Sequence, residues 1–73
     1  MTQQAIAQTG SPVDDATYNL LQALTSKLEA IEAYEMYAED EAETGGGLFE
    51  DLAEQDRQHA ERLLEALRQR LAR

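Results

Sequence analysis

The segment Glu39–Leu52 reads EDEAETGGGLFEDL, and its three glycines at 45–47 divide the chain. No other glycine or proline interrupts the chain after position 12. A glycine run ends a helix and supplies the left-handed backbone that a tight reversal needs. The pattern therefore predicts a helix over about residues 12–43, a turn at 44–47 and a second helix over about 48–72.

Composition points to helices as well. Of the 31 hydrophobic residues, 12 are alanine and 10 are leucine, against one valine and two isoleucines. Alanine and leucine favour helix, whereas the scarce β-branched residues favour strands. Ser11 and Pro12 are a typical helix start, because serine caps and proline fits the first helical position. We expect an all-α fold in which residues 1–10 form a flexible tail and 11–73 an antiparallel helical hairpin.

Each predicted helix carries an apolar stripe with spacings of three and four. The stripe of the first helix holds Val13, Leu20, Leu24, Lys27, Leu28, Ile31, Tyr34, Glu35 and Ala38. The stripe of the second holds Leu48, Phe49, Leu52, Asp56, His59, Leu63, Ala66, Leu67 and Arg70. Two helices alone cannot cover both stripes. We therefore expect the hairpin to form a four-helix bundle by homodimerisation, or a larger homo-oligomer.

Charge limits the function classes. Fifteen acidic and six basic residues give a net charge of −9, which disfavours both nucleic acid and anionic membrane surfaces as partners. No apolar run approaches 18 residues, and the N-terminal residues lack the charged and apolar regions of a signal peptide. Disulfides and thiolate metal sites are excluded because the chain has no cysteine. We expect a cytoplasmic protein.

The charges also support the antiparallel arrangement. Residues 1–47 hold nine acids and one base, whereas 48–73 hold six acids and five arginines. Reversal at the glycines predicts that Arg70 and Arg73 lie beside Asp14 and Asp15. Arginines near the C-terminal end of the second helix also interact favourably with its dipole.

Four ionisable residues interrupt the stripes, namely Lys27, Glu35, Asp56 and His59. Buried charge is costly unless it is paired or bound to a metal ion, so these positions are chemically informative. Asp56 and His59 are three residues apart and lie on one face of a helix. In a two-fold dimer this pair occurs twice, and two carboxylates with two imidazoles suit iron, manganese or zinc.

The same residues also allow a metal-free interpretation. Lys27 can extend along apolar surface to water, or pair with Asp56 or Glu35 and close the core by salt bridges. Tyr34 is interpreted as a packing residue whose hydroxyl is satisfied.

Two segments resemble a known family. Residues 27–34, KLEAIEAY, resemble the first-helix signature of bacterioferritin-type proteins, Glu-Leu-x-Ala-Ile-x-x-Tyr. Residues 56–63, DRQHAERL, are similar to the second-helix signature, Glu-x-x-His-Ala-(Asp/Glu)-Lys-Leu. The short hairpin also resembles the encapsulated ferritins, half-length members of the ferritin-like superfamily whose di-iron site is completed by dimerisation. The resemblance covers about residues 16–72.

The resemblance implies a site that binds iron and oxidises Fe(II) with oxygen, but the site is altered here. Lys27 stands where the family has its first-helix glutamate, Asp56 replaces the longer second-helix glutamate, and His59 is unchanged. A charged ammonium cannot coordinate a cation and repels one nearby. Ferroxidase activity is therefore left open and not favoured. The resemblance to encapsulated ferritins does not include their targeting extension, and we do not expect one here.

We therefore predict a ferritin-like iron-binding protein, or one binding Mn or Zn, with a degenerate carboxylate/histidine site built across a homodimer. Its candidate metal ligands are Asp56, His59 and Glu35. The alternative is a metal-free structural or protein-interaction hairpin dimer, in which Lys27 replaces the metal by salt bridges.

Overall fold

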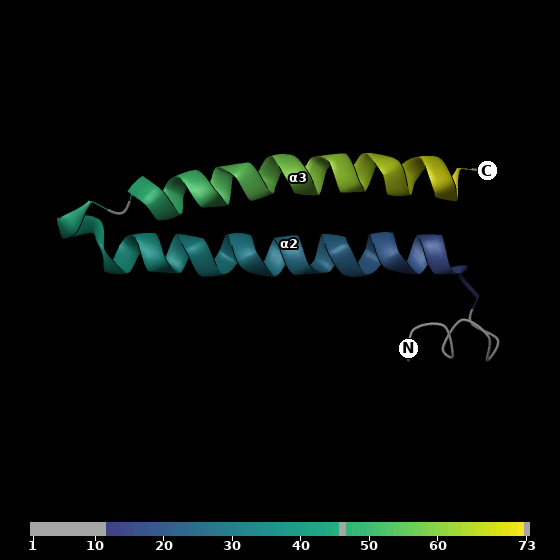
Figure 1. Ribbon diagram of the computed structural model, residues 1–73. Helices are drawn as coiled ribbons and strands as arrows, with labels where there is room; N and C mark the ends of the chain where they lie inside the picture. The colour runs from purple at the N-terminus through teal and green to yellow at the C-terminus, as the bar shows by residue number, and fades with distance from the viewer. Residues whose placement is uncertain (1–11, 46, 73) are drawn as a thin grey trace.

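Two long helices dominate the computed structural model, which describes residues 12–45 and 47–72. Helix α2 spans Asp15–Asp40, a short 3₁₀ helix η1 spans Ala42–Thr44, and α3 spans Gly47–Leu71. Figure 1 shows α2 and α3 side by side and antiparallel, joined at one end through η1. No strand occurs in the described residues, so the prediction of an all-helical hairpin agrees with the structure. The predicted tail, residues 1–10, lies outside the described residues.

Helix α2 begins three residues later than the predicted start at about residue 12. Asp14 is its N-cap, because the Asp14 side chain accepts a hydrogen bond of 2.9 Å from the backbone N–H of Thr17. A carboxylate at this position satisfies a free N–H group and interacts favourably with the helix dipole. The predicted cap, Ser11, lies outside the described residues, and Pro12 and Val13 precede the helix.

The reversal starts earlier than the sequence predicts. Helix α2 ends at Asp40 rather than near residue 43, and η1 tightens the chain before Gly45. The acidic residues at 39–41 contribute to this early end, because the negative end of a helix dipole disfavours carboxylates. Gly45 then adopts φ +95°, a left-handed conformation that glycine takes without steric cost. Helix α3 begins at Gly47, one residue before the predicted position.

Small residues line the contact between the two helices. The buried hydrophobic residues are Ala38, Ala53, Ala60 and Leu67, and the buried polar residues are Thr17 and Asp56. On α3 the buried Ala53, Ala60 and Leu67 recur every seven residues, which is the spacing of an antiparallel coiled-coil seam. No large side chain among the described residues is fully buried, so one hairpin has only a thin core.

An aromatic cluster packs the hairpin near its turn. The ring of Phe49 on α3 stacks on Tyr34 with centroids 6.0 Å apart and meets Tyr37 edge-on at 5.3 Å. The two tyrosine rings are 6.3 Å apart. Tyr34 therefore packs against aromatic neighbours, in line with its interpretation from the sequence.

Candidate metal centre

The candidate site lies midway along the hairpin, where Lys27 on α2 meets Asp56 and His59 on α3. Lys27 Nζ donates a hydrogen bond of 3.0 Å to Asp56 Oδ1. The same oxygen lies 3.3 Å from His59 Nδ1. Asp56 is only 8% exposed, whereas the side chain of His59 is about half-exposed. One buried carboxylate oxygen thus contacts both an ammonium group and an imidazole.

The spacing of residues along α3 explains this geometry. Asp56 lies three residues after the buried Ala53 and four before the buried Ala60, so it belongs to the seam. His59 lies one turn further on, within reach of the Asp56 carboxylate. His59 and Lys27 also line one open pocket together with Ala23, Arg62 and Leu63. Lys27 and His59 therefore border solvent on one side of the buried Asp56 carboxylate.

Electrostatics favours the ionised form of Asp56. The hydrogen bond from Lys27 lowers the pKa of Asp56 below its ordinary value of 3.8, and the contact with His59 acts in the same direction. Burial acts in the opposite direction and is outweighed. The structure thus selects Asp56 as the partner of Lys27 from the two that the sequence left open.

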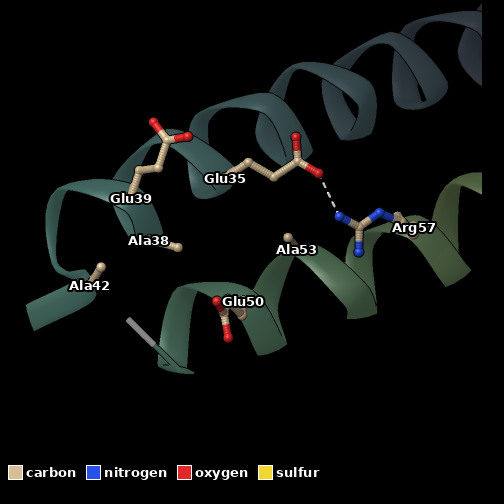
Figure 2. Close-up of a pocket in the computed structure, with 7 residues that line it drawn as sticks. All are labelled: Glu35, Ala38, Glu39, Ala42, Glu50, Ala53 and Arg57. Carbon is tan, nitrogen blue, oxygen red and sulfur yellow. Dashed lines mark hydrogen bonds and ion pairs between the residues drawn. The ribbon is translucent and has the colours of Figure 1, made fainter. Parts of the chain in front are cut away.

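Glu35 lies apart from this group. Glu35 Oε2 accepts a hydrogen bond of 2.5 Å from Arg57 Nη2, and Arg57 also donates to Glu54 at 2.9 Å. These two hydrogen bonds raise the pKa of Arg57 above its ordinary value, and the bond to Glu35 has the larger effect. Figure 2 shows Glu35 on α2 extended toward Arg57 on α3.

The pocket at Glu35 is a different one from the pocket at His59. Its lining consists of Glu35, Ala38, Glu39, Ala42, Glu50, Ala53 and Arg57. It shares no residue with the pocket that Lys27 and His59 line. The structure therefore brings Asp56 and His59 together and places the third predicted ligand, Glu35, with an arginine instead.

The donor set of one chain does not suffice for a metal ion. A carboxylate and an imidazole are suitable ligands for iron, manganese or zinc. However, residues 12–45 and 47–72 contain no group of three or more histidine, cysteine, aspartate or glutamate residues that could hold one. The ammonium of Lys27 is also bonded to the carboxylate that would bind the metal. A single hairpin thus offers only part of such a site.

Arg57, the partner of Glu35, is a residue that the sequence pattern does not predict to be involved. It follows Asp56 directly and stands outside the apolar stripe, so nothing in the pattern singled it out. Its position nine residues after the predicted helix start at 48 gives no hint of a partner on the other helix. The only available indication was its charge, opposite to that of Glu35.

Arg70 was placed correctly by the sequence. Arg70 Nη2 donates to Asp14 Oδ2 at 2.6 Å, and Arg70 Nε donates to Thr17 Oγ1 at 3.1 Å. The predicted approach of Arg70 to Asp14 is therefore confirmed, while Arg73 lies outside the described residues. In the described part of the chain, neither helix is both long and apolar enough to cross a membrane.

Comparison with known proteins identifies the family. A family model described as Rubrerythrin matches residues 18–72, which is most of the chain and includes both Lys27 and the Asp56–His59 pair. No curated protein and no solved structure matches the sequence significantly. The match covers both long helices, from the first turn of α2 to the end of α3. The chain therefore belongs to the rubrerythrin family, a family of ferritin-like helical domains.

Proposed function

We propose that this protein is a ferritin-like iron-binding protein whose metal site is completed when two hairpins pair as a homodimer. The observation that carries the proposal is the Asp56–His59 pair, with Asp56 Oδ1 3.3 Å from His59 Nδ1, inside the segment that matches the rubrerythrin family. Iron is the metal that such domains usually bind. The short hairpin format resembles the encapsulated ferritins, and its two helix segments resemble the signatures of bacterioferritin-type proteins.

The chemistry of the pair supports a role in metal binding. When Nδ1 of His59 donates its hydrogen to Asp56, Nε2 carries the lone pair that a metal ion can accept. The Asp56 carboxylate then both orients the imidazole and supplies negative charge. Bound iron would supply Lewis acidity and redox chemistry at this position.

A second copy supplies what one chain lacks. Two Asp56–His59 pairs provide two carboxylates and two imidazoles, a set of four donors of the types that iron accepts. The apolar surface also favours pairing, because Leu28 is 54% exposed and Leu71 is 64% exposed on a hairpin with a thin core. Small domains of this size often gain stability from oligomerisation.

Glu35 is the third candidate ligand in this proposal. Its carboxylate must leave Arg57 before it can bind a metal, because Arg57 holds it at 2.5 Å. Glu35 is therefore assigned a supporting role, behind Asp56 and His59. Ferroxidase turnover is outside the proposal, since Lys27 occupies the position of a ligand in the bacterioferritin-type signature.

Metal binding by the purified protein tests the proposal. The metal-free protein is titrated anaerobically with Fe(II), and separately with Mn(II) and Zn(II), while its mass is followed by analytical ultracentrifugation. We expect a dimer that binds metal, and we expect Asp56→Asn and His59→Ala to lose binding. Glu61→Gln is the matched control, because it removes one exposed acidic charge from the same helix. A wild-type protein that binds none of these metals would refute the proposal.

The salt bridge between Lys27 and Asp56 favours a second candidate function. With an ammonium group 3.0 Å from the carboxylate, the hairpin can act as a metal-free structural or interaction module, again as a dimer. This candidate predicts a dimer of unchanged stability after exhaustive chelation. An increase in thermal stability when Fe(II) is added to the chelated protein would instead support the iron-binding function.

A further inference from the structure

We propose that Lys27 is the resident cation of the buried Asp56 carboxylate, so that the hairpin folds without metal and a metal ion binds only by displacing this ammonium group. The proposal has two halves. The first half, the role of Lys27 in the metal-free fold, stands independently. The second half, displacement of the Lys27 ammonium by a metal ion, rests on the proposed metal-binding function.

The burial of Asp56 requires a counter-charge. Asp56 is 8% exposed, and an ionised carboxylate with so little access to water is costly unless it is paired. Lys27 Nζ provides the pairing at 3.0 Å, from the opposite helix. The contact with His59 adds a second hydrogen-bonding group on the same oxygen.

Two of the arginines on α3 pair with other residues. Arg57, the neighbour of Asp56 in sequence, donates to Glu35 and Glu54. Arg70 donates to Asp14 and Thr17 at the open end of the hairpin. Among the described residues, Lys27 is thus the lysine or arginine that pairs with Asp56.

A metal ion and the Lys27 ammonium compete for the Asp56 carboxylate. The ammonium has three hydrogens and no lone pair, so it cannot act as a ligand while charged. Two positive charges a few ångströms apart also repel each other strongly at a partly buried site. Occupancy of the carboxylate by one cation therefore weakens binding of the other.

Lys27 has a path by which to leave. Its side chain is 37% exposed and it lines the open pocket beside His59. A lysine stem can stay on the apolar wall while the ammonium moves into water. Displacement thus requires a change of side-chain rotamers rather than opening of the helices.

Substitutions at position 27 separate the two halves of the proposal. Lys27→Met keeps the aliphatic stem and removes the charge, and Lys27→Gln keeps a hydrogen-bond donor should Lys27→Met fail to fold. Lys27→Arg keeps the charge. Arg62→Met is the matched control, because Arg62 lines the same pocket and its loss removes an equal charge.

Thermal unfolding of the chelated protein tests the first half. We expect Lys27→Met and Lys27→Gln to lower Tm by several degrees, and Lys27→Arg and Arg62→Met to leave it nearly unchanged. The double variant with Lys27→Met and Asp56→Asn should regain most of the lost Tm, because the unpaired charge of Asp56 is then removed. An unchanged or higher Tm for Lys27→Met and Lys27→Gln would overturn the counter-ion role.

Calorimetric titration with Zn(II) tests the second half, since zinc has no redox chemistry to complicate the readout. We expect Lys27→Met to bind Zn(II) at least about tenfold more tightly than the wild type, as the loss of a nearby charge implies. Arg62→Met should change the affinity much less. Equal affinities of wild type and Lys27→Met would overturn the competition. Absence of binding in every variant would refute the proposed metal function, while the unfolding measurements would still decide the role of Lys27 as counter-ion.

Discussion

Arg70 on α3 donates a hydrogen bond of 2.6 Å to the carboxylate of Asp14, the N-cap of α2. The last turns of α3 are thereby fastened to the first residues of α2, at the end of the hairpin that has no connecting turn (Figure 1). Asp14 also accepts from the backbone N–H of Thr17, and Arg70 reaches the Thr17 hydroxyl. Asp14, Thr17 and Arg70 thus link the N-cap of α2 to the contact between the two helices.

This arrangement predicts a dependence of stability on acid pH. The hydrogen bonds from Thr17, together with Arg70, lower the pKa of Asp14 from 3.8 to about 2. The folded state therefore favours the carboxylate, and the resulting stabilisation is present above about pH 4 and lost as the pH falls through about 2. We expect wild type to be more stable than Asp14→Asn at neutral pH, with the difference shrinking between about pH 4 and 2. Urea unfolding at several pH values, at fixed protein concentration, measures it; a difference independent of pH would contradict the assignment.

The tight contact between the helices predicts that Ala53 tolerates no larger side chain. Ala53 is 1% exposed in the seam between α2 and α3. Ala53→Leu should lower the free energy of unfolding by about 1–3 kcal/mol, the usual cost of overpacking. Chemical denaturation measures the loss, with Ala72→Leu as control because Ala72 is exposed at the end of α3. Equal stability of Ala53→Leu and wild type would show that the helices can separate without cost.

The glycines of the turn should respond in opposite ways to alanine. Gly45 has φ +95°, so Gly45→Ala should destabilise the protein by about 1–2 kcal/mol through backbone strain. Gly47 starts α3, and a Cβ there would meet no atom within 4 Å. Gly47→Ala should therefore stabilise by about 0.4–1 kcal/mol, because the unfolded chain loses freedom. Thermal unfolding of the two variants side by side checks the sign, and a shift in the same direction for both would contradict the turn geometry.

The sequence predicted the hairpin well because its strongest features act locally. Two glycine- and proline-free stretches rich in alanine and leucine specify helices, and the glycines specify the reversal. The ends of the helices were harder to predict. Ser11-Pro12 and Asp14 are both good starts within four residues, and the choice of Asp14 depends on hydrogen bonds to Thr17 and Arg70.

The candidate site was predictable only in part, for a geometric reason. A helical projection places Asp56 and His59 on one face, and the structure brings them into contact. A helical projection cannot tell on which side of the seam between two helices a stripe residue will lie. Glu35 belongs to the same projected stripe as Lys27, yet it lines a different pocket and pairs with Arg57.

This separation predicts that the three candidate ligands contribute unequally to metal binding. Asp56 and His59 share one contact, whereas Glu35 is held by Arg57. We expect Glu35→Gln to weaken Fe(II) or Zn(II) binding far less than Asp56→Asn or His59→Ala. Glu54→Gln is the matched control, because it removes the other carboxylate that Arg57 contacts. If Glu35→Gln abolishes binding while Glu54→Gln does not, Glu35 is a ligand in its own right and must leave Arg57 when two hairpins assemble.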